Sequence, residues 1–210
     1  MPLSWKVARA CVLAALLAGA TGCELAVIGA ATAAFSIAED RRTSGTQLDD
    51  ESIQVRAQSR VGERFGDKAH VNVTSFSRMA LVTGEAPDAA TREEISRIVL
   101  GVPNVRSIAN EVQLASPSTR ASRINDEIIT TKIKGQLIDS PDVSLVHVKV
   151  VTEAGVVFLL GLVTEREAER AVQIARTTGG VVKVVKLFEY CTPADERCRS
   201  RTTDTQKPGG

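Results

Sequence analysis

Apolar residues recur at every fourth position in one stretch of the chain and at alternating positions in the next. The first pattern, at residues 53–65, is typical of a helix with one buried face, and the acidic residues at 49–51 are expected to cap its start. The second pattern, at residues 69–76, is typical of a half-buried strand. Continued along the chain, these signals predict a helix up to residue 65, strands at 69–76 and 79–83, a helix at 88–100, and a third strand at 105–114.

The same order of elements returns in the second half of the chain. Its copy begins at Asn125-Asp126-Glu127, 76 residues after Asp49-Asp50-Glu51, and a His-Val-x-Val sequence occurs in both copies, at His70 and at His147. Thr164 and Glu167 have the spacing of a capping box at a helix start. The second copy is predicted to contain a helix at 126–140, strands at 146–150 and 156–160, a helix after Thr164, and a last strand at 181–190.

This duplication predicts an α+β fold class built from two tandem small modules. Each module has the order helix-strand-strand-helix-strand, with a mixed three-stranded sheet covered by two helices. The predicted boundaries are residues 1–22 for a signal peptide, 23–47 for a leader, 48–116 for the first module, 117–123 for a linker, 124–191 for the second module and 192–210 for a flexible tail.

The N-terminal residues have the layout of a secretory signal. Lys6 and Arg9 precede an uncharged apolar run at 11–20, and small residues lead to Cys23. The run is too short to span a bilayer, which needs about 20 residues. A cysteine at the cut site resembles a bacterial lipobox, which implies that Cys23 is acylated, and Glu24 then favours sorting to the outer membrane. A plain secreted protein with an incidental cysteine is the alternative.

Composition argues against several classes of function. The net charge of +1 and the 3% of aromatic residues give no footprint for binding nucleic acid. No nucleophile elbow, phosphate-binding loop or metalloprotease motif is present, and the only two histidines, His70 and His147, lie at matching strand positions, which favours a structural or solvent-facing role. We therefore expect no enzyme activity, no cofactor, no metal and no small-molecule substrate.

Two further cysteines, Cys191 and Cys198, lie close together near the C-terminus. In an oxidising periplasm such a pair can form a disulfide. Zinc is the alternative, but two thiols without a nearby histidine make a poor zinc site. The sequence favours a small disulfide-bonded loop.

The duplicated module resembles the BON family in size and element order. The features that carry the resemblance are the glycine after the second strand, Gly84 or Gly161, and the Gly-Val-x-x-Val entry to the third strand at Gly101 and Gly180. Together with the lipobox, the chain from about Cys23 to Tyr190 resembles the dual-BON outer-membrane lipoproteins, and the tail from Cys191 to Gly210 is outside that resemblance. That resemblance implies a protein that is lipid-anchored in the outer membrane, faces the periplasm, binds anionic phospholipid and supports envelope integrity. The alternative is an interaction scaffold, for example a partner of the outer-membrane barrel-assembly machinery.

The helix at 126–140 carries a second surface besides its core stripe of Ile129, Ile133 and Leu137. That surface mixes apolar, small and basic residues: Ile128, Thr131, Lys132, Lys134, Gly135 and Ile138. One interpretation is a membrane-facing helix whose apolar side chains enter the headgroup region while its lysines meet lipid phosphates. The other is that Ile128 and Ile138 pack against the first module. The matching helix of the first module is expected to present an ordinary solvated face of Gln54, Arg56, Gln58, Arg60, Glu63 and Arg64.

Overall fold

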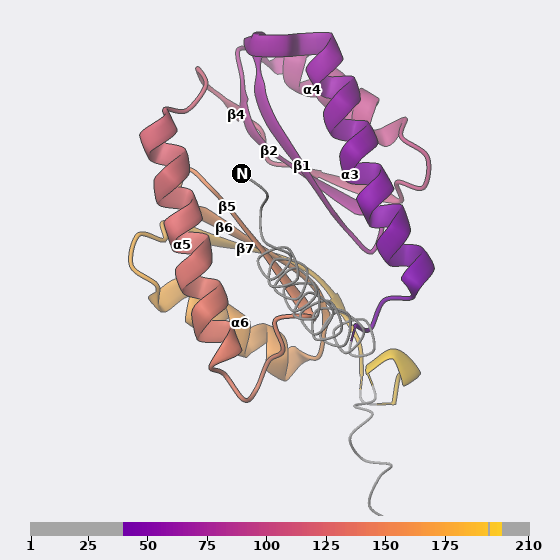
Figure 1. Ribbon diagram of the computed structural model, residues 1–210, viewed down its shortest axis with the longest axis vertical. Helices are drawn as coiled ribbons and strands as arrows, with labels where there is room; N and C mark the ends of the chain where they lie inside the picture. The colour runs from indigo at the N-terminus through magenta and orange to yellow at the C-terminus, as the bar shows by residue number, and fades with distance from the viewer. Residues whose placement is uncertain (1–39, 193, 199–210) are drawn as a thin grey trace, which may run out of the picture. The chain divides into compact units, whose positions relative to one another are not determined.

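The computed structural model describes residues 40–192 and 194–198 (Figure 1). The predicted signal peptide, Cys23 and the rest of the leader up to residue 39, and most of the C-terminal tail lie outside these residues. Among the helices within the described ranges, none is both long enough and apolar enough to cross a membrane.

The first module packs helices against one face of a small mixed sheet. The central strand is β2, which pairs antiparallel with β1 and parallel with both β3 and β4. Its elements are α3 (Ser44–Phe65), the 3-10 turn η1 (Gly66–Lys68), β1 (His70–Phe76), β2 (Met79–Ala86), α4 (Ala89–Leu100), β3 (Ser107–Asn110) and β4 (Gln113–Leu114).

The second module repeats this arrangement with a three-stranded sheet in the order β5-β6-β7, where β6 is antiparallel to β5 and parallel to β7. The predicted α+β fold class of two tandem modules is confirmed. The elements of the second module are α5 (Arg120–Ile138), β5 (Val148–Glu153), β6 (Val156–Val163), α6 (Glu165–Thr177), β7 (Lys183–Tyr190) and the 3-10 turn η2 (Glu196–Cys198).

The first helix of each module begins earlier than its hydrophobic pattern predicts. Thr43 and Thr119 are the N-caps, and their hydroxyls accept the backbone N–H groups of Thr46 and Ser122. The prediction that the acidic residues at 49–51 cap the helix is therefore wrong. Threonine caps the helix end just as well, and the first turn of each helix is polar and leaves no periodic signal.

The predicted third strand of the first module is divided into β3 and β4. The side-chain oxygen of Asn110 accepts the backbone N–H of Val112 at 3.0 Å, a local turn that interrupts the ladder. The backbone N–H of Glu111 still bonds to the carbonyl of Val82 at 2.8 Å, so both pieces stay paired with β2.

Each module buries its own apolar core between its helices and its sheet, around Ile53 and Val82 in the first and around Ile133 and Leu159 in the second. A third apolar cluster draws residues from both modules: Phe76, Leu81, Phe158, Leu160, Leu162, Cys191 and Cys198. Successive side chains of β2 and β6 point to opposite faces of their sheets. Val82 and Leu159 lie in the cores of their own modules, whereas their neighbours Leu81 and Leu160 lie in the cluster that both modules share. The modules therefore dock through their sheets, which leaves the outer faces of their helices uncovered.

Candidate functional site

A row of exposed residues runs along α5, on the side away from the core. Ile124, Ile128 and Ile138 expose 53%, 47% and 68% of their surface. Thr131 and Gly135, which lie between them in the same row, are also exposed. The spacing of four, three, four and three residues keeps all five on one side of a helix with 3.6 residues per turn. We call these five residues the α5 stripe.

The opposite side of α5 fixes its orientation. Ile129, Ile133 and Leu137 are buried in the core of the second module. The hydroxyl of Thr130 donates to that of Thr152 on β5 at 2.7 Å. The α5 stripe therefore faces outward because the helix cannot turn without exposing its core side chains.

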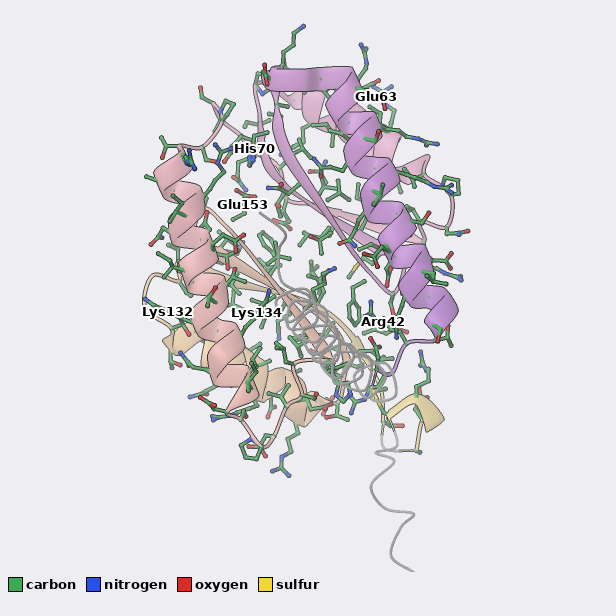
Figure 2. The ribbon with its side chains drawn as sticks, in the orientation of Figure 1. Arg42, Glu63, His70, Lys132, Lys134 and Glu153 are labelled. Atoms are coloured by element: carbon green, nitrogen blue, oxygen red, sulfur yellow. A yellow bond between two sulfur atoms is a disulfide. The ribbon has the colours of Figure 1, made fainter. Side chains whose placement is uncertain are left out.

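Basic side chains flank the stripe. Lys132 and Lys134, both labelled in Figure 2, are exposed and lie on either side of the row, roughly 80° from it around the helix axis. A shallow groove with a largely apolar lining follows the first turns of α5 and includes Ile128, the basic residues Arg120, Arg123 and Lys132, and one acidic residue, Glu127. The arrangement suits a partner that combines an apolar part with negative charge.

Gly135 is not explained by packing. A Cβ atom added at this position would meet nothing within 4 Å, so alanine would fit. Glycine inside a helix costs about 1 kcal/mol relative to alanine. Its effect here is to leave a gap in the middle of the exposed row, between Thr131 and Ile138.

All six surface residues predicted from the sequence, from Ile128 to Ile138, are exposed on α5. None of them belongs to the shared cluster between the modules. The interpretation in which Ile128 and Ile138 pack against the first module therefore does not describe this structure. The sequence analysis missed Ile124, because it began the helix at residue 126. The signal that could have found it is the spacing of four residues between Ile124 and Ile128.

On α3, the helix of the first module that corresponds to α5, two of the residues expected to be solvated form hydrogen bonds with other elements. Gln54 accepts a hydrogen bond from Lys149 of the second module at 2.9 Å, and burial, the main cause, lowers the pKa of Lys149. Gln58 bonds through both ends of its amide to the backbone of β1, at the carbonyl of Val71 and the N–H of Val73. Gln58 thus satisfies backbone groups at the free edge of the first sheet, since β1 is an edge strand, while Gln54 bonds a side chain of the second module.

The two histidines each lie beside a carboxylate. His70 Nδ1 is 3.1 Å from Glu85, and His147 Nδ1 is 3.2 Å from Glu167. Burial raises the pKa of Glu167, but hydrogen bonds from His147, Arg41 and Thr164 outweigh it and hold that pKa well below its ordinary value. Arg41 contributes two of these bonds, at 2.7 and 3.0 Å, and also donates to the carbonyl of Leu162. The segment that leads into α3 is thereby attached to the second module.

Cys191 and Cys198 form a disulfide, with their Cα atoms 6.1 Å apart. Both residues are buried in the shared cluster. The bridge therefore fixes the end of the second module against apolar side chains of both sheets.

Residues 49–116 and 125–192 match the BON domain model. The outer membrane lipoprotein DolP of Haemophilus influenzae is 36% identical over 182 residues, covering 84% of this chain and 94% of that protein. The 21 kDa hemolysin of Actinobacillus pleuropneumoniae is 33% identical over 153 residues, covering 72% and 79%. Among solved structures, CdsD, a structural protein of the type III secretion system of Chlamydia trachomatis, covers 74% of this chain and 98% of that chain at 14% identity and a TM-score of 0.30, too low to carry an argument. The resemblance to the dual-BON lipoproteins is confirmed.

Proposed function

Because this chain belongs to the BON domain family, with two BON domains in tandem, we propose that it is an outer-membrane lipoprotein that binds anionic phospholipid. In this proposal Cys23 carries the lipid, the two modules face the periplasm, and the protein supports envelope integrity as a binding protein rather than as an enzyme. Its similarity to a protein named outer membrane lipoprotein DolP supports the location.

The observation that carries the lipid-binding proposal is the α5 stripe with its flanking lysines. Three isoleucines stay exposed on a helix whose other side is fully used by the core. A helix lies at a membrane surface when an apolar row enters the headgroup region and basic residues beside it meet lipid phosphates. Lys132 and Lys134 have the required position on either side of the row.

The expected free energy of binding between α5 and an anionic membrane suits reversible contact. Burying one isoleucine side chain completely is worth about 1.5–3 kcal/mol, and each lysine near an anionic surface about 1 kcal/mol. The α5 stripe and its lysines together supply several kcal/mol. A lipid anchor on the same chain would raise the local concentration of membrane, so modest affinity is sufficient.

Vesicle co-sedimentation tests this function. A Cys23→Ser protein is used, so that the proposed anchor does not contribute, with vesicles of phosphatidylcholine alone or with added phosphatidylglycerol. Binding to the anionic vesicles and not to the zwitterionic ones supports the proposal. Binding to neither contradicts it and favours the scaffold function, with the barrel-assembly machinery as the first partner to examine by cross-linking.

A further inference from the structure

Three side chains able to bind a metal ion converge where the two modules meet. His70 begins β1, Glu85 lies on β2 and Glu153 ends β5, so two come from the first module and one from the second. One ligand atom from each lies within 4.8 Å of the other two. Figure 2 labels His70 and Glu153, which belong to different sheets.

The surrounding structure holds each of these side chains in place. His70 and Glu85 are directly opposite in the β1–β2 ladder. Glu153 stands just before the hairpin turn of its module, and it accepts a hydrogen bond from the side-chain amide of Asn72 at 3.1 Å. The three groups are therefore preorganised, as a metal site requires.

The charges of this cluster are not balanced by basic side chains. Glu85 and Glu153 expose only 5% and 7% of their surface. Within residues 40–192 and 194–198, neither carboxylate forms an ion pair with lysine or arginine, and the imidazole of His70 lies 3.1 Å from Glu85. Two buried carboxylates so close together call for a positive partner.

We propose that His70, Glu85 and Glu153 bind one divalent transition-metal ion, with Zn²⁺ as the best match. Zinc accepts a mixture of imidazole nitrogen and carboxylate oxygen, whereas Ca²⁺ and Mg²⁺ prefer sites made of oxygen alone. Three protein ligands leave a fourth position for water. Of the three ligands, His70 also lines a surface groove that includes Asp67 and Arg123.

Because its ligands come from both modules, the bound ion joins β1 and β2 of the first module to β5 of the second. Glu153 is also next to the turn that Asp126 of α5 holds through the backbone N–H groups of Ala154 and Gly155. Metal binding would therefore stabilise the docked arrangement of the modules.

The test is isothermal titration of the chelator-treated full-length protein with ZnCl₂ at pH 7, together with thermal unfolding with and without zinc. We expect one equivalent to bind and the unfolding temperature to rise. Glu153→Gln and His70→Ala should each weaken the affinity at least about tenfold and abolish the rise. His147→Gln is the matched control, because it removes a second histidine that also lies beside a glutamate but belongs to no cluster of three potential ligands within the part of the chain that the structure describes.

Two checks distinguish loss of the metal site from loss of the fold. Glu153→Gln is close to isosteric and removes a buried charge, so it should fold, and circular dichroism without metal checks this. Co²⁺ should give the visible absorption of a four-coordinate site in the wild type and in His147→Gln, but not in Glu153→Gln. The proposal is overturned if the wild type shows no saturable binding, or if the His70 and Glu153 variants bind zinc as well as the His147 variant does.

Discussion

Asp50 and Asp126 lie at equivalent positions of α3 and α5, 76 residues apart, and each carboxylate binds the hairpin turn of its own module. Asp50 accepts the backbone N–H groups of Ser77 and Arg78 at 2.8 and 2.7 Å. Asp126 accepts those of the next hairpin at 3.0 and 2.9 Å. In both modules a buried carboxylate on the first helix thus sets the turn between the first two strands.

These turns need such support because their backbone is strained. Ser77 and Arg78 have φ angles of 52° and 63°, and Ala154 has one of 50°. The left-handed region costs a residue with a side chain about 1–2 kcal/mol. Hydrogen bonds from backbone N–H groups to a buried carboxylate are strong enough to offset this cost. The helix and the hairpin of each module are therefore stabilised together.

We expect Asp126→Ala to lower the free energy of unfolding by about 3–6 kcal/mol. It removes two hydrogen bonds to a charged group, each worth about 1.5–3 kcal/mol, and leaves buried N–H groups without a partner. Urea denaturation followed by circular dichroism measures the change. Asp139→Ala, an exposed residue at the other end of α5, is the control and should change stability by about 0.5 kcal/mol or less. Equal stability of the two variants would contradict the assigned role of Asp126.

Glu167 is expected to make stability depend on pH. Its pKa in the folded protein lies below the ordinary value, so its contribution is complete above about pH 5 and is lost as the pH falls through the folded-state pKa. Arg41 is nearly buried, and Glu167→Gln removes the carboxylate that pairs with it. The substitution should therefore lower the free energy of unfolding by about 2–4 kcal/mol at pH 7.

The measurement is a pair of denaturant titrations of wild type and Glu167→Gln at pH 7 and near pH 3. The difference between the two proteins should be smaller at the lower pH. Arg166→Gln is the control, because the side chain of Arg166 is 81% exposed and its partner Asp142 is itself partly exposed. A difference that stays constant with pH would show that the charge of Glu167 is not what stabilises the fold.

The disulfide is tested by alkylation. Cys191 and Cys198 should remain unlabelled in denatured, non-reduced protein from the periplasm and become labelled after reduction. Their loop is short, so the bridge should contribute about 2–3 kcal/mol, which a Cys191→Ser, Cys198→Ser variant would lose in urea denaturation. Two thiols that react without reduction would contradict the bridge.

The proposed anchor depends on Cys23, which precedes the described residues. Cys23→Ser should release the protein from the membrane fraction or leave the signal peptide uncut, since the acylated thiol is the proposed attachment. Fractionation and intact-mass measurement of the wild type and the variant check this. Unchanged fractionation with an unchanged mass would show that Cys23 carries no lipid.

Periodicity was sufficient to predict the fold because each module buries one face of each helix. Ile53 and Ile129, the first residues of their core stripes, are both buried at the predicted positions. The N-caps were missed because Thr43 and Thr119 precede polar turns without a hydrophobic pattern. The apolar run at Phe158, Leu159 and Leu160 predicted a strand, but periodicity within one module could not show that the second face of this strand is covered by the other module.

The two candidate sites differ in how much of each could be predicted from the sequence. The α5 stripe belongs to one helix, so its spacing alone predicts which residues share a face. The proposed metal site includes Glu85 of the first module and Glu153 of the second, and no local sequence pattern relates residues so far apart in the chain. Only the docking of the two sheets brings them together.

The membrane-facing role of α5 gives the last prediction. Ile128→Asp should weaken binding to phosphatidylglycerol-containing vesicles about tenfold or more, which corresponds to about 1.4 kcal/mol. The substitution removes an apolar side chain from the headgroup region and adds a carboxylate that lipid phosphates repel. Val55→Asp on α3 is the matched control. Val55 is 67% exposed and lies 76 residues before Thr131, at the equivalent helix position of the first module, and its replacement should leave binding unchanged.

A second variant separates the charge contribution from the apolar one. Lys132→Glu should also weaken binding, and it should reduce the dependence of binding on salt, because fewer basic groups then face the lipid phosphates. Ile128→Asp should leave the salt dependence nearly as it was. Both variants should keep the wild-type stability within about 0.5 kcal/mol, since both side chains are exposed. If Ile128→Asp folds and binds vesicles like the wild type, α5 does not face the membrane, and its exposed isoleucines are then better explained as a docking surface for a protein.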